Sequence, residues 1–258
     1  MITIKSEHAI KDMKAAGAIV YYAMREAAKA IVPGVSTKDI DHIAYDYIIK
    51  AGALPSFKGY DGFPGTLCIS LNDEVVHGIP SKKRFIREGD IVSLDCGAIV
   101  NGYHADSALT VPVGKVAPEV LQLIEKTEQS FWIGIEKAVA GNRLHDIGHA
   151  IQSYVESFGY GVVRELCGHG VGTHLHEDPQ VPNYGVPGTG IRLRKGMTIA
   201  VEPMITLGSP RIYRGDDGWV IATTDGKPAA HYEHTILITD EKPIILTIPE
   251  EIKEGKSE

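Results

Sequence analysis

The sequence predicts one α/β (α+β) domain built from two similar halves. Two amphipathic helices followed by short strands make up the first half, and the same order starts again near Pro118. Shifting the chain by 107 residues aligns identical turn residues, among them Gly34 with Gly141 and Gly89 with Gly196. Because a fixed offset marks a duplicated unit, we expect a pseudo-twofold domain. It should span residues 1–250, with half repeats at about 1–115 and 116–249 and a tail at 251–258.

Turn and cap residues delimit the elements of the first half. Ser6 is a good N-cap, and the apolar residues that follow at spacings of three and four predict a helix that ends at Pro33-Gly34. A second helix should run from near Ser36 to Gly52, with Asp39 in capping-box position. A loop rich in glycine and proline is then expected at 53–65, followed by short strands at 66–71 and 74–78.

Residues 89–110 are predicted to form a β-hairpin, because alternating segments flank Asn101-Gly102, a dipeptide suited to a two-residue type I′ turn. Counting outward from the turn places Gly97 opposite Asp106 and Ala108 opposite Asp95. Residues two apart on a strand share a face, so Asp95 and Asp106 point the same way as diagonal neighbours. The hairpin therefore brings two like charges together.

Such a pair of aspartates has two interpretations. A solvated hairpin face is one of them, but the segments 91–94 and 108–111 beside Asp95 and Asp106 are apolar and predict a buried strand pair. Unpaired carboxylates in that setting would be strongly destabilising. The alternative is half of an oxygen-rich metal site, which the rest of the chain must complete.

The second half supplies two further carboxylates. It begins with a helix that has Pro118 in its first turn. The shift by 107 residues places Glu202 on Asp95. Extra residues follow at about 207–217, and counting outward from an expected Asp225-Gly226 turn places Glu233 opposite Gly218. His231-x-Glu233 then corresponds to His104-x-Asp106, and all four carboxylates should point into the seam between the halves.

Two divalent cations would balance these four carboxylates. Oxygen ligands alone suit magnesium or calcium, whereas a histidine ligand favours manganese, iron, cobalt or zinc. His169 is the best histidine candidate, since Gly168 and Gly170 let the backbone approach closely; the alternative for any one histidine is a hydrogen-bonded structural role. The shift aligns His169 with Gly62, so this ligand would make the two metal positions inequivalent.

These residues together resemble the type I methionine aminopeptidases, in their short bacterial form, of the pita-bread metallopeptidase family. The resemblance covers nearly the whole chain. It is carried by Asp95 and Asp106 and by the runs Asn72-Asp73-Glu74-Val75-Val76-His77-Gly78-Ile79-Pro80, Gly168-His169-Gly170-Val171-Gly172, His176-Glu177-x-Pro179, Glu202-Pro203 and Tyr232-Glu233-His234.

The resemblance implies a pita-bread fold around a central dinuclear metal site. The implied ligands of two divalent ions (cobalt, manganese, iron or zinc) are Asp95, Asp106, His169, Glu202 and Glu233, with Asp106 and Glu233 bridging. The implied reaction is removal of the N-terminal methionine from peptides and nascent proteins with a small second residue, by attack of a metal-bridged water. Glu202 would act as general base, and His77 and His176 would contact the substrate.

The resemblance also implies an apolar pocket for the methionine side chain. Its expected residues are Phe57, Tyr60, Phe63, Cys68 and Trp219, for each of which core packing is the alternative. Cys96 should point to the opposite face from Asp95 and belong to the core. His174 and His234 match no catalytic position and are given a structural role.

Three other functions and the type II subfamily are the alternatives to this assignment. A proline-directed aminopeptidase or dipeptidase of the same fold would carry an extra N-terminal domain, whereas the repeat begins almost at Met1. A binding module that had lost its ligands would lack some of the five, and all are present. A structural metal protein would not need His77 and His176 beside an open site. The type II subfamily has a large insertion between its metal histidine and the next glutamate, but only 33 positions separate His169 from Glu202.

Composition limits the partners and the compartment. The 258 residues include 43% hydrophobic residues and carry a net charge of −7, which gives no overall basic surface for DNA or anionic membranes. Three cysteines without close pairing fit a reducing compartment. We expect a cytoplasmic monomer that acts on peptide or nascent-chain N-termini, with the ribosome as a possible partner, no membrane contact, and a disordered end from Glu250 to Glu258.

Overall fold

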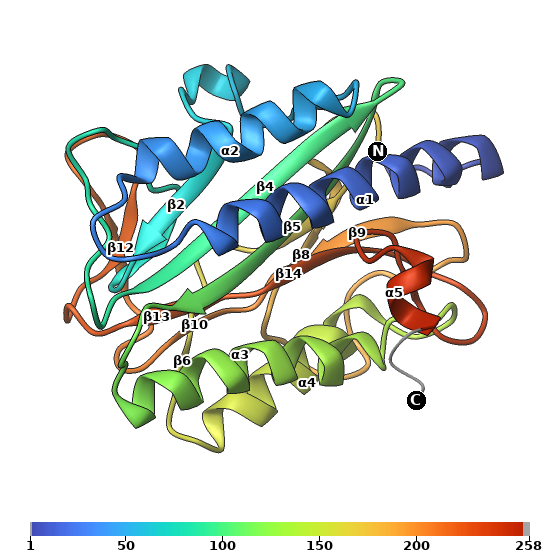
Figure 1. Ribbon diagram of the computed structural model, residues 1–258. Helices are drawn as coiled ribbons and strands as arrows, with labels where there is room; N and C mark the ends of the chain where they lie inside the picture. Colours follow the sequence, from blue (N-terminus) through green and yellow to red (C-terminus); the bar gives the residue numbers. More distant parts are fainter. Residues whose placement is uncertain (1, 255–258) are drawn as a thin grey trace.

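The structure is a computed structural model that describes residues 2–254. Two pairs of helices, α1 with α2 and α3 with α4, pack against a large curved sheet (Figure 1). Among the described helices, none combines the length and the apolar character that a membrane span requires. The predicted order of helices and strands is confirmed, and it places long helices in both halves.

The helices of the first half begin where the sequence predicts. Helix α1 spans Glu7–Lys29, and the Ser6 side chain accepts a hydrogen bond from the Ala9 N–H. Helix α2 spans Thr37–Lys50, and Ser36 accepts from the Asp39 N–H in the same way. The remaining elements of this half are β1 Leu54–Pro55, the 3₁₀ turn η1 Tyr60–Gly62, β2 Leu67–Leu71, β3 Glu74–Val76, β4 Ile91–Val100 and β5 Tyr103–Pro112.

The second half repeats the helix pair and then has more, shorter strands. Helix α3 spans Pro118–Ile135 with proline in its first turn, and α4 spans Leu144–Glu156. The strands are β6 Gly161–Val162, β7 Gly168–Gly170, β8 Glu177–Val181, β9 Thr198–Val201, β10 Met204–Thr206, β11 Ile212–Arg214, β12 Ile221–Thr223, β13 Ala229–His231, β14 Glu233–Leu237 and β15 Ile244–Ile245. A short helix, α5 Glu250–Glu254, follows.

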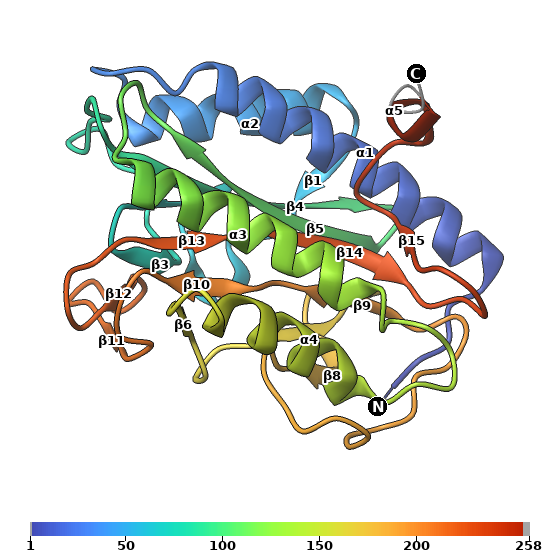
Figure 2. The ribbon, with the colours of Figure 1, turned by 90° about the horizontal axis from the view of Figure 1, so that it is seen from below.

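The large sheet runs through both halves. Its strand order is β1-β4-β5-β14-β9-β7-β8, with β2 also paired to β4 and β15 to β14. The contact between β5 and β14 therefore joins the halves (Figure 2). Two three-stranded sheets complete the fold, in the orders β13-β10-β6 and β11-β12-β3.

The register predicted for the first hairpin is confirmed throughout. Ala108 pairs with Asp95 and Asp106 with Gly97, and the turn residues Asn101 and Gly102 have the positive φ angles of 49° and 82° that a type I′ turn needs. Cys96 lies in the apolar cluster formed with α1 and α2. Asp95 therefore points to the other face of the sheet, away from these helices.

The pairing predicted for the second half is wrong. Strand β12 pairs with β11 and with β3 of the first half, so Glu233 does not lie opposite Gly218. Instead β14 pairs with β9, where His234 faces Val201, and β13 pairs with β10, where Met204 faces His231. Counting between these pairs places Glu233 level with Glu202. The extra residues form β11 and lead β12 away from the seam.

The chain end also differs from the disorder expected from Glu250 onward. Residues Glu250–Glu254 form α5, which is attached to α1 by an ion pair between Lys14 and Glu250 at 2.6 Å. Tyr22 donates a further hydrogen bond to Glu251. The rest of the expected tail, residues 255–258, lies outside the described part of the chain.

Candidate metal centre

Three neighbouring strands bring three carboxylates to one place. Ala108 of β5 pairs with Asp95 of β4 on one side and with Glu233 of β14 on the other. Asp106 lies two residues before Ala108 and so shares its face of the sheet. Glu202 directly follows β9, the strand on the far side of β14. The four predicted carboxylates therefore come together, although the pairing of the second two differs from the prediction.

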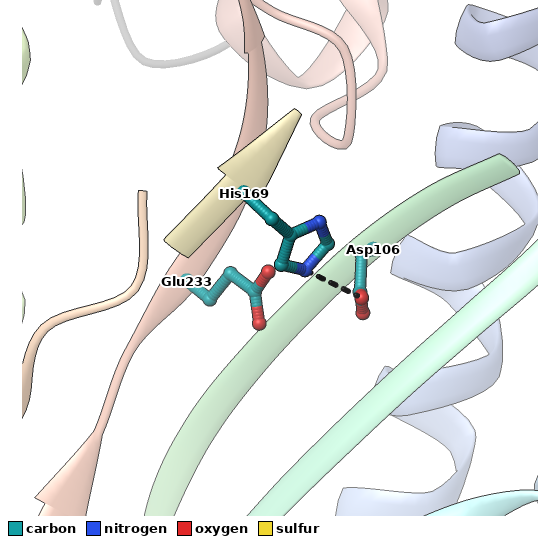
Figure 3. A group of neighbouring side chains, drawn as sticks. All are labelled: Asp106, His169 and Glu233. Carbon is teal, nitrogen blue, oxygen red and sulfur yellow. Dashed lines mark ion pairs between the residues drawn. The ribbon is translucent and has the colours of Figure 1, made fainter. Parts of the chain in front are cut away.

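His169 faces these carboxylates from β7. Its Nε2 lies 3.8 Å from Oδ2 of Asp106 (Figure 3). The same atom lies 3.7 Å from Oε1 of Glu202. The Nδ1 atom lies 2.9 Å from the Gly170 carbonyl oxygen. Because a carbonyl only accepts, Nδ1 carries the proton and Nε2 presents a lone pair, as a metal ligand does. One potential ligand atom each from Asp106, His169 and Glu233 lie within 4.8 Å of one another.

The glycines beside His169 allow the backbone of β7 to lie close to its neighbours. A Cβ on Gly168 would lie 2.3 Å from the Ala200 carbonyl oxygen, and one on Gly170 would lie 2.2 Å from that of Asp178. Any side chain at these positions would push β7 away from its neighbours. The close approach expected from the sequence is confirmed.

Burial raises the pKa of all four carboxyl groups. It raises the pKa of Asp95 to about 7, and it raises that of Asp106 well above its ordinary value with further contributions from Glu233 and Asp95. The pKa values of Glu202 and Glu233 are also raised, first by burial and then by the neighbouring carboxylates. Burial lowers the pKa of His169 to about 3, so this ring is neutral at physiological pH.

The donor set fits divalent cations. Among the described residues, Asp95 Oδ1, Asp106 Oδ1 and Glu233 Oε1 are buried with no hydrogen-bond partner. Buried acceptors without donors are costly, and bound cations would satisfy them while reversing the rise in pKa. A neutral histidine together with carboxylate oxygens suits manganese, iron, cobalt or zinc.

All residues predicted for catalysis and substrate binding line one cavity of about 300 Å³ beside this centre. His176 lies with its ring centroid 4.2 Å from that of His169, and its Nδ1 lies 2.7 Å from the Tyr60 hydroxyl. His77, which follows β3, is also at the cavity; burial lowers its pKa to about 4. The far end is apolar and formed by Phe57, Phe63, Cys68, Leu175 and Trp219.

Comparison with known proteins agrees with this geometry. The family model described as metallopeptidase family M24 matches residues 11–240. The chain belongs to metallopeptidase family M24. This M24 peptidase is 53% identical to the methionine aminopeptidase of Clostridium acetobutylicum, over 97% of its own length and 100% of that relative. It is 51% identical to methionine aminopeptidase 1 of Bacillus subtilis, over 96% and 99% of the two chains.

Solved structures confirm the pita-bread fold. The methionine aminopeptidase of Thermotoga maritima superposes with a TM-score of 0.94 at 47% identity, covering 96% of this M24 peptidase and 99% of that chain. The prolidase of Pyrococcus furiosus shares the fold with a TM-score of 0.78 at 24% identity, and the match covers 66% of that chain.

Sequence reasoning gave no role to one residue of the M24 site, His231. It is fully buried at the cavity, and neither ring nitrogen has a hydrogen-bond partner among the described residues. Its Nε2 lies 3.9 Å from Oε2 of Glu202 and 3.7 Å from Oε2 of Glu233. The sequence did contain one indication of this position: His231 precedes Glu233 by two residues, and residues two apart on a strand share a face. Its approach to Glu202 depends on pairing between distant segments.

A structural role was expected for His174 and His234, the other two histidines near the motifs. The Nδ1 of His234 lies 3.0 Å from Ser107 Oγ and 2.9 Å from Thr247 Oγ1, and its Nε2 lies 3.1 Å from the Tyr232 hydroxyl. His174 is exposed, with its Nδ1 3.3 Å from Thr173 Oγ1. Neither residue lines the 300 Å³ cavity.

Proposed function

We propose that this M24 peptidase is a metal-dependent methionyl aminopeptidase, which removes the N-terminal methionine from peptides and nascent proteins whose second residue is small. One observation carries the proposal: the carboxylate and histidine centre and a cluster of apolar side chains line the same cavity of about 300 Å³. The full-length identity to relatives named methionine aminopeptidases supports it. We further propose that it works in the cytoplasm as a monomer and meets nascent chains at the ribosome.

We assign Asp95, Asp106, His169, Glu202 and Glu233 as the ligands of two divalent cations. Cations bound there would acidify a water molecule and polarise the scissile carbonyl. The unpartnered oxygens of Asp95, Asp106 and Glu233 and the lone pair on His169 Nε2 support this assignment.

The side chains around the centre can move and hold the protons of the reaction. Glu202 takes a proton from the attacking water and passes it to the leaving amine. If the Tyr60 hydroxyl donates to Nδ1 of His176, the proton of that ring sits on Nε2, which can then donate to the developing oxyanion. His77 lines the same cavity and is assigned to the scissile amide.

The apolar end of the cavity is assigned to the methionine side chain. Cys68 pairs across the sheet with Asp95, so this pocket begins directly beside the carboxylates. The rings of Phe63 and Trp219 pack edge to face with centroids 5.1 Å apart and close one wall. Phe57 and Tyr60 complete the assigned set. An unbranched thioether fits such a pocket without leaving a polar atom unpaired.

Peptide hydrolysis tests the proposal directly. Purified protein is stripped with chelator, reconstituted separately with cobalt, manganese, iron and zinc, and assayed on Met-Ala-Ser, Met-Leu-Ser and Ala-Pro peptides. We expect release of methionine from Met-Ala-Ser alone, abolished by chelation. Turnover of Ala-Pro only, or of no peptide with any metal, would overturn the assignment.

A further inference from the structure

A buried ion pair ties the start of the chain to the loop that carries His176. Lys5 lies just before α1, and Glu177 is the first residue of β8. The Lys5 Nζ lies 2.7 Å from Glu177 Oε2, with side-chain exposures of only 6% and 9%. Removing one partner of such a pair leaves an uncompensated buried charge, so the contact constrains both segments.

The Glu177 carboxylate also contacts two residues that precede His176 in the same loop, His174 and Thr173. Its Oε1 accepts from the His174 backbone N–H at 3.3 Å and lies 3.4 Å from Thr173 Oγ1, while its Oε2 accepts from Thr3 Oγ1 at 3.0 Å. Burial alone would raise the pKa of Glu177, but the hydrogen bond and the charge of Lys5 lower it below its ordinary value. The carboxylate is therefore charged and connects two segments far apart in sequence.

The space for this pair exists because residue 172 is glycine. A Cβ on Gly172 would lie 2.3 Å from Glu177 Oε1 and 2.5 Å from Lys5 Cε. The Lys5 backbone is itself anchored, since its N–H donates to the Gly196 carbonyl at 2.8 Å. Lys5 thus reaches over the glycine from a fixed position.

His176 needs such support because packing surrounds it incompletely. It lines the 300 Å³ site cavity and also a neighbouring cavity of about 700 Å³, which Thr3 and Glu177 line too. The ring is held by its contact with the Tyr60 hydroxyl at 2.7 Å. Its backbone precedes Glu177 directly, so the carboxylate fixes the other end.

We propose that Lys5 is a positioning residue for His176. Through Glu177 it fixes the backbone of the loop, and with it the place of the His176 ring relative to the metal centre. This inference rests on the proposed role of His176 in peptide hydrolysis.

A double-mutant cycle tests it. Lys5→Met keeps the aliphatic stem and removes the charge, and we expect kcat on Met-Ala-Ser to fall about tenfold with KM changed less than about twofold. In a His176→Ala background the same substitution should lower kcat by less than about twofold, because the residue through which Lys5 acts is absent. Lys14→Met, which breaks an ion pair with Glu250 away from the loop, is the matched control and should leave kcat unchanged.

Two readouts do not depend on turnover. Metal affinity, measured by calorimetry, should be unaltered in Lys5→Met, because His169 is held by the Gly170 carbonyl and not by this pair. In spectra of ¹³C-labelled histidine, the His176 signal, identified by its loss in His176→Ala, should shift or broaden in Lys5→Met but not in Lys14→Met. If Lys5→Met does not fold, Thr3→Val is the second variant. It removes one hydrogen bond to Glu177, and we expect a smaller effect in the same direction.

The outcomes separate this inference from the proposed function. An inactive wild-type protein would refute the peptidase assignment, and the histidine spectra would still decide whether Lys5 positions His176. Wild-type kinetics in Lys5→Met, an unchanged His176 signal, or an equal loss of kcat in the His176→Ala background would each overturn the positioning role.

Discussion

Glu202 occupies a special place among the four carboxylates. Its Oε1 faces His169 Nε2 at 3.7 Å, and its Oε2 faces His231 Nε2 at 3.9 Å. Asp95, in contrast, lies on the far side of β5 from β14 and β9. Glu202 is thus the carboxylate that lies between two histidines, and it lines the cavity, as the general-base role proposed for it requires.

The residue-level prediction concerns Glu202→Gln. The amide keeps the shape of the side chain but cannot take a proton, so kcat on Met-Ala-Ser should fall by about 10²-fold or more. Metal content, measured by atomic absorption, should be retained because four of the five assigned ligands remain. Glu165→Gln changes an exposed glutamate that directly precedes Leu166, a residue of the cavity lining, and is the control. Full activity in Glu202→Gln would contradict the general-base role.

At the scale of elements, the two hairpins show what local sequence can and cannot predict. The Asn101-Gly102 turn fixes its own register, because both residues must adopt positive φ and the strands follow without a break. The Asp225-Gly226 dipeptide predicted a local hairpin in the same way. Instead, β12 pairs with Val76 of β3, a partner about 145 residues away in the sequence. Pairing over that distance depends on tertiary packing, which a local pattern does not contain.

The candidate site was more predictable than the strand pairing that builds it. The motif residues identified Asp95, Asp106, His169, Glu202 and Glu233, and the structure brings all five to one cavity. Carboxylates in apolar strands are conspicuous because their burial needs a reason. His231 is less conspicuous in the sequence, because a single buried histidine usually has a structural explanation.

The element-level prediction concerns Gly97, which seats the loop carrying Phe57 against β4. A Cβ at residue 97 would lie 2.7 Å from Ser56 Cβ and 2.9 Å from Phe57 Cε1. Gly97→Ala should therefore displace Phe57, raise KM for Met-Ala-Ser by about tenfold and leave metal content unchanged. Kinetics and metal analysis check this expectation.

The neighbouring residue provides the control for Gly97. Ala98 packs in the apolar cluster of α1 and α2, so Ala98→Gly should lower the unfolding temperature without changing KM. A normal KM in Gly97→Ala would show that the loop tolerates displacement and that Phe57 does not shape the pocket.

At the scale of the whole molecule, the candidate metal centre lies where the two halves join. The Asp106 N–H donates to Thr235 Oγ1 at 2.9 Å, and that hydroxyl donates to the Asp106 carbonyl at 2.9 Å, so the strands are locked at the site itself. Packing of the halves forces the carboxylates together. Without cations this arrangement is stable only while some of these carboxyl groups hold protons.

The stability of the metal-free protein should therefore depend on pH in a way that bound metal removes. A folded-state pKa of about 7 for Asp95, against an ordinary 3.8, means that the folded protein holds more protons than the unfolded one in that range. Stability from such groups falls as pH rises. Burial also lowers the pKa values of five histidines from 6.5: those of His77 and His104 fall to about 4, those of His169 and His231 to about 3, and that of His176 is lowered too. These groups act in the opposite direction, and their effect fades as pH rises above 6.5.

Above pH 6.5 the histidine effect fades, and the raised pKa values of the four carboxyl groups and of the buried Cys68 and Cys96 thiols all lower stability as pH rises. For each carboxyl group whose folded-state pKa lies above the working pH, the free energy of unfolding falls by about 1.4 kcal/mol per pH unit. In chelator, the unfolding temperature measured by calorimetry should fall between pH 6.5 and 8, and less steeply in Asp95→Asn. Saturating manganese should abolish the fall, because cations bind the deprotonated carboxylates. A metal-free protein whose unfolding temperature stays level or rises over this range would mean that the four carboxylates are not held together in the seam.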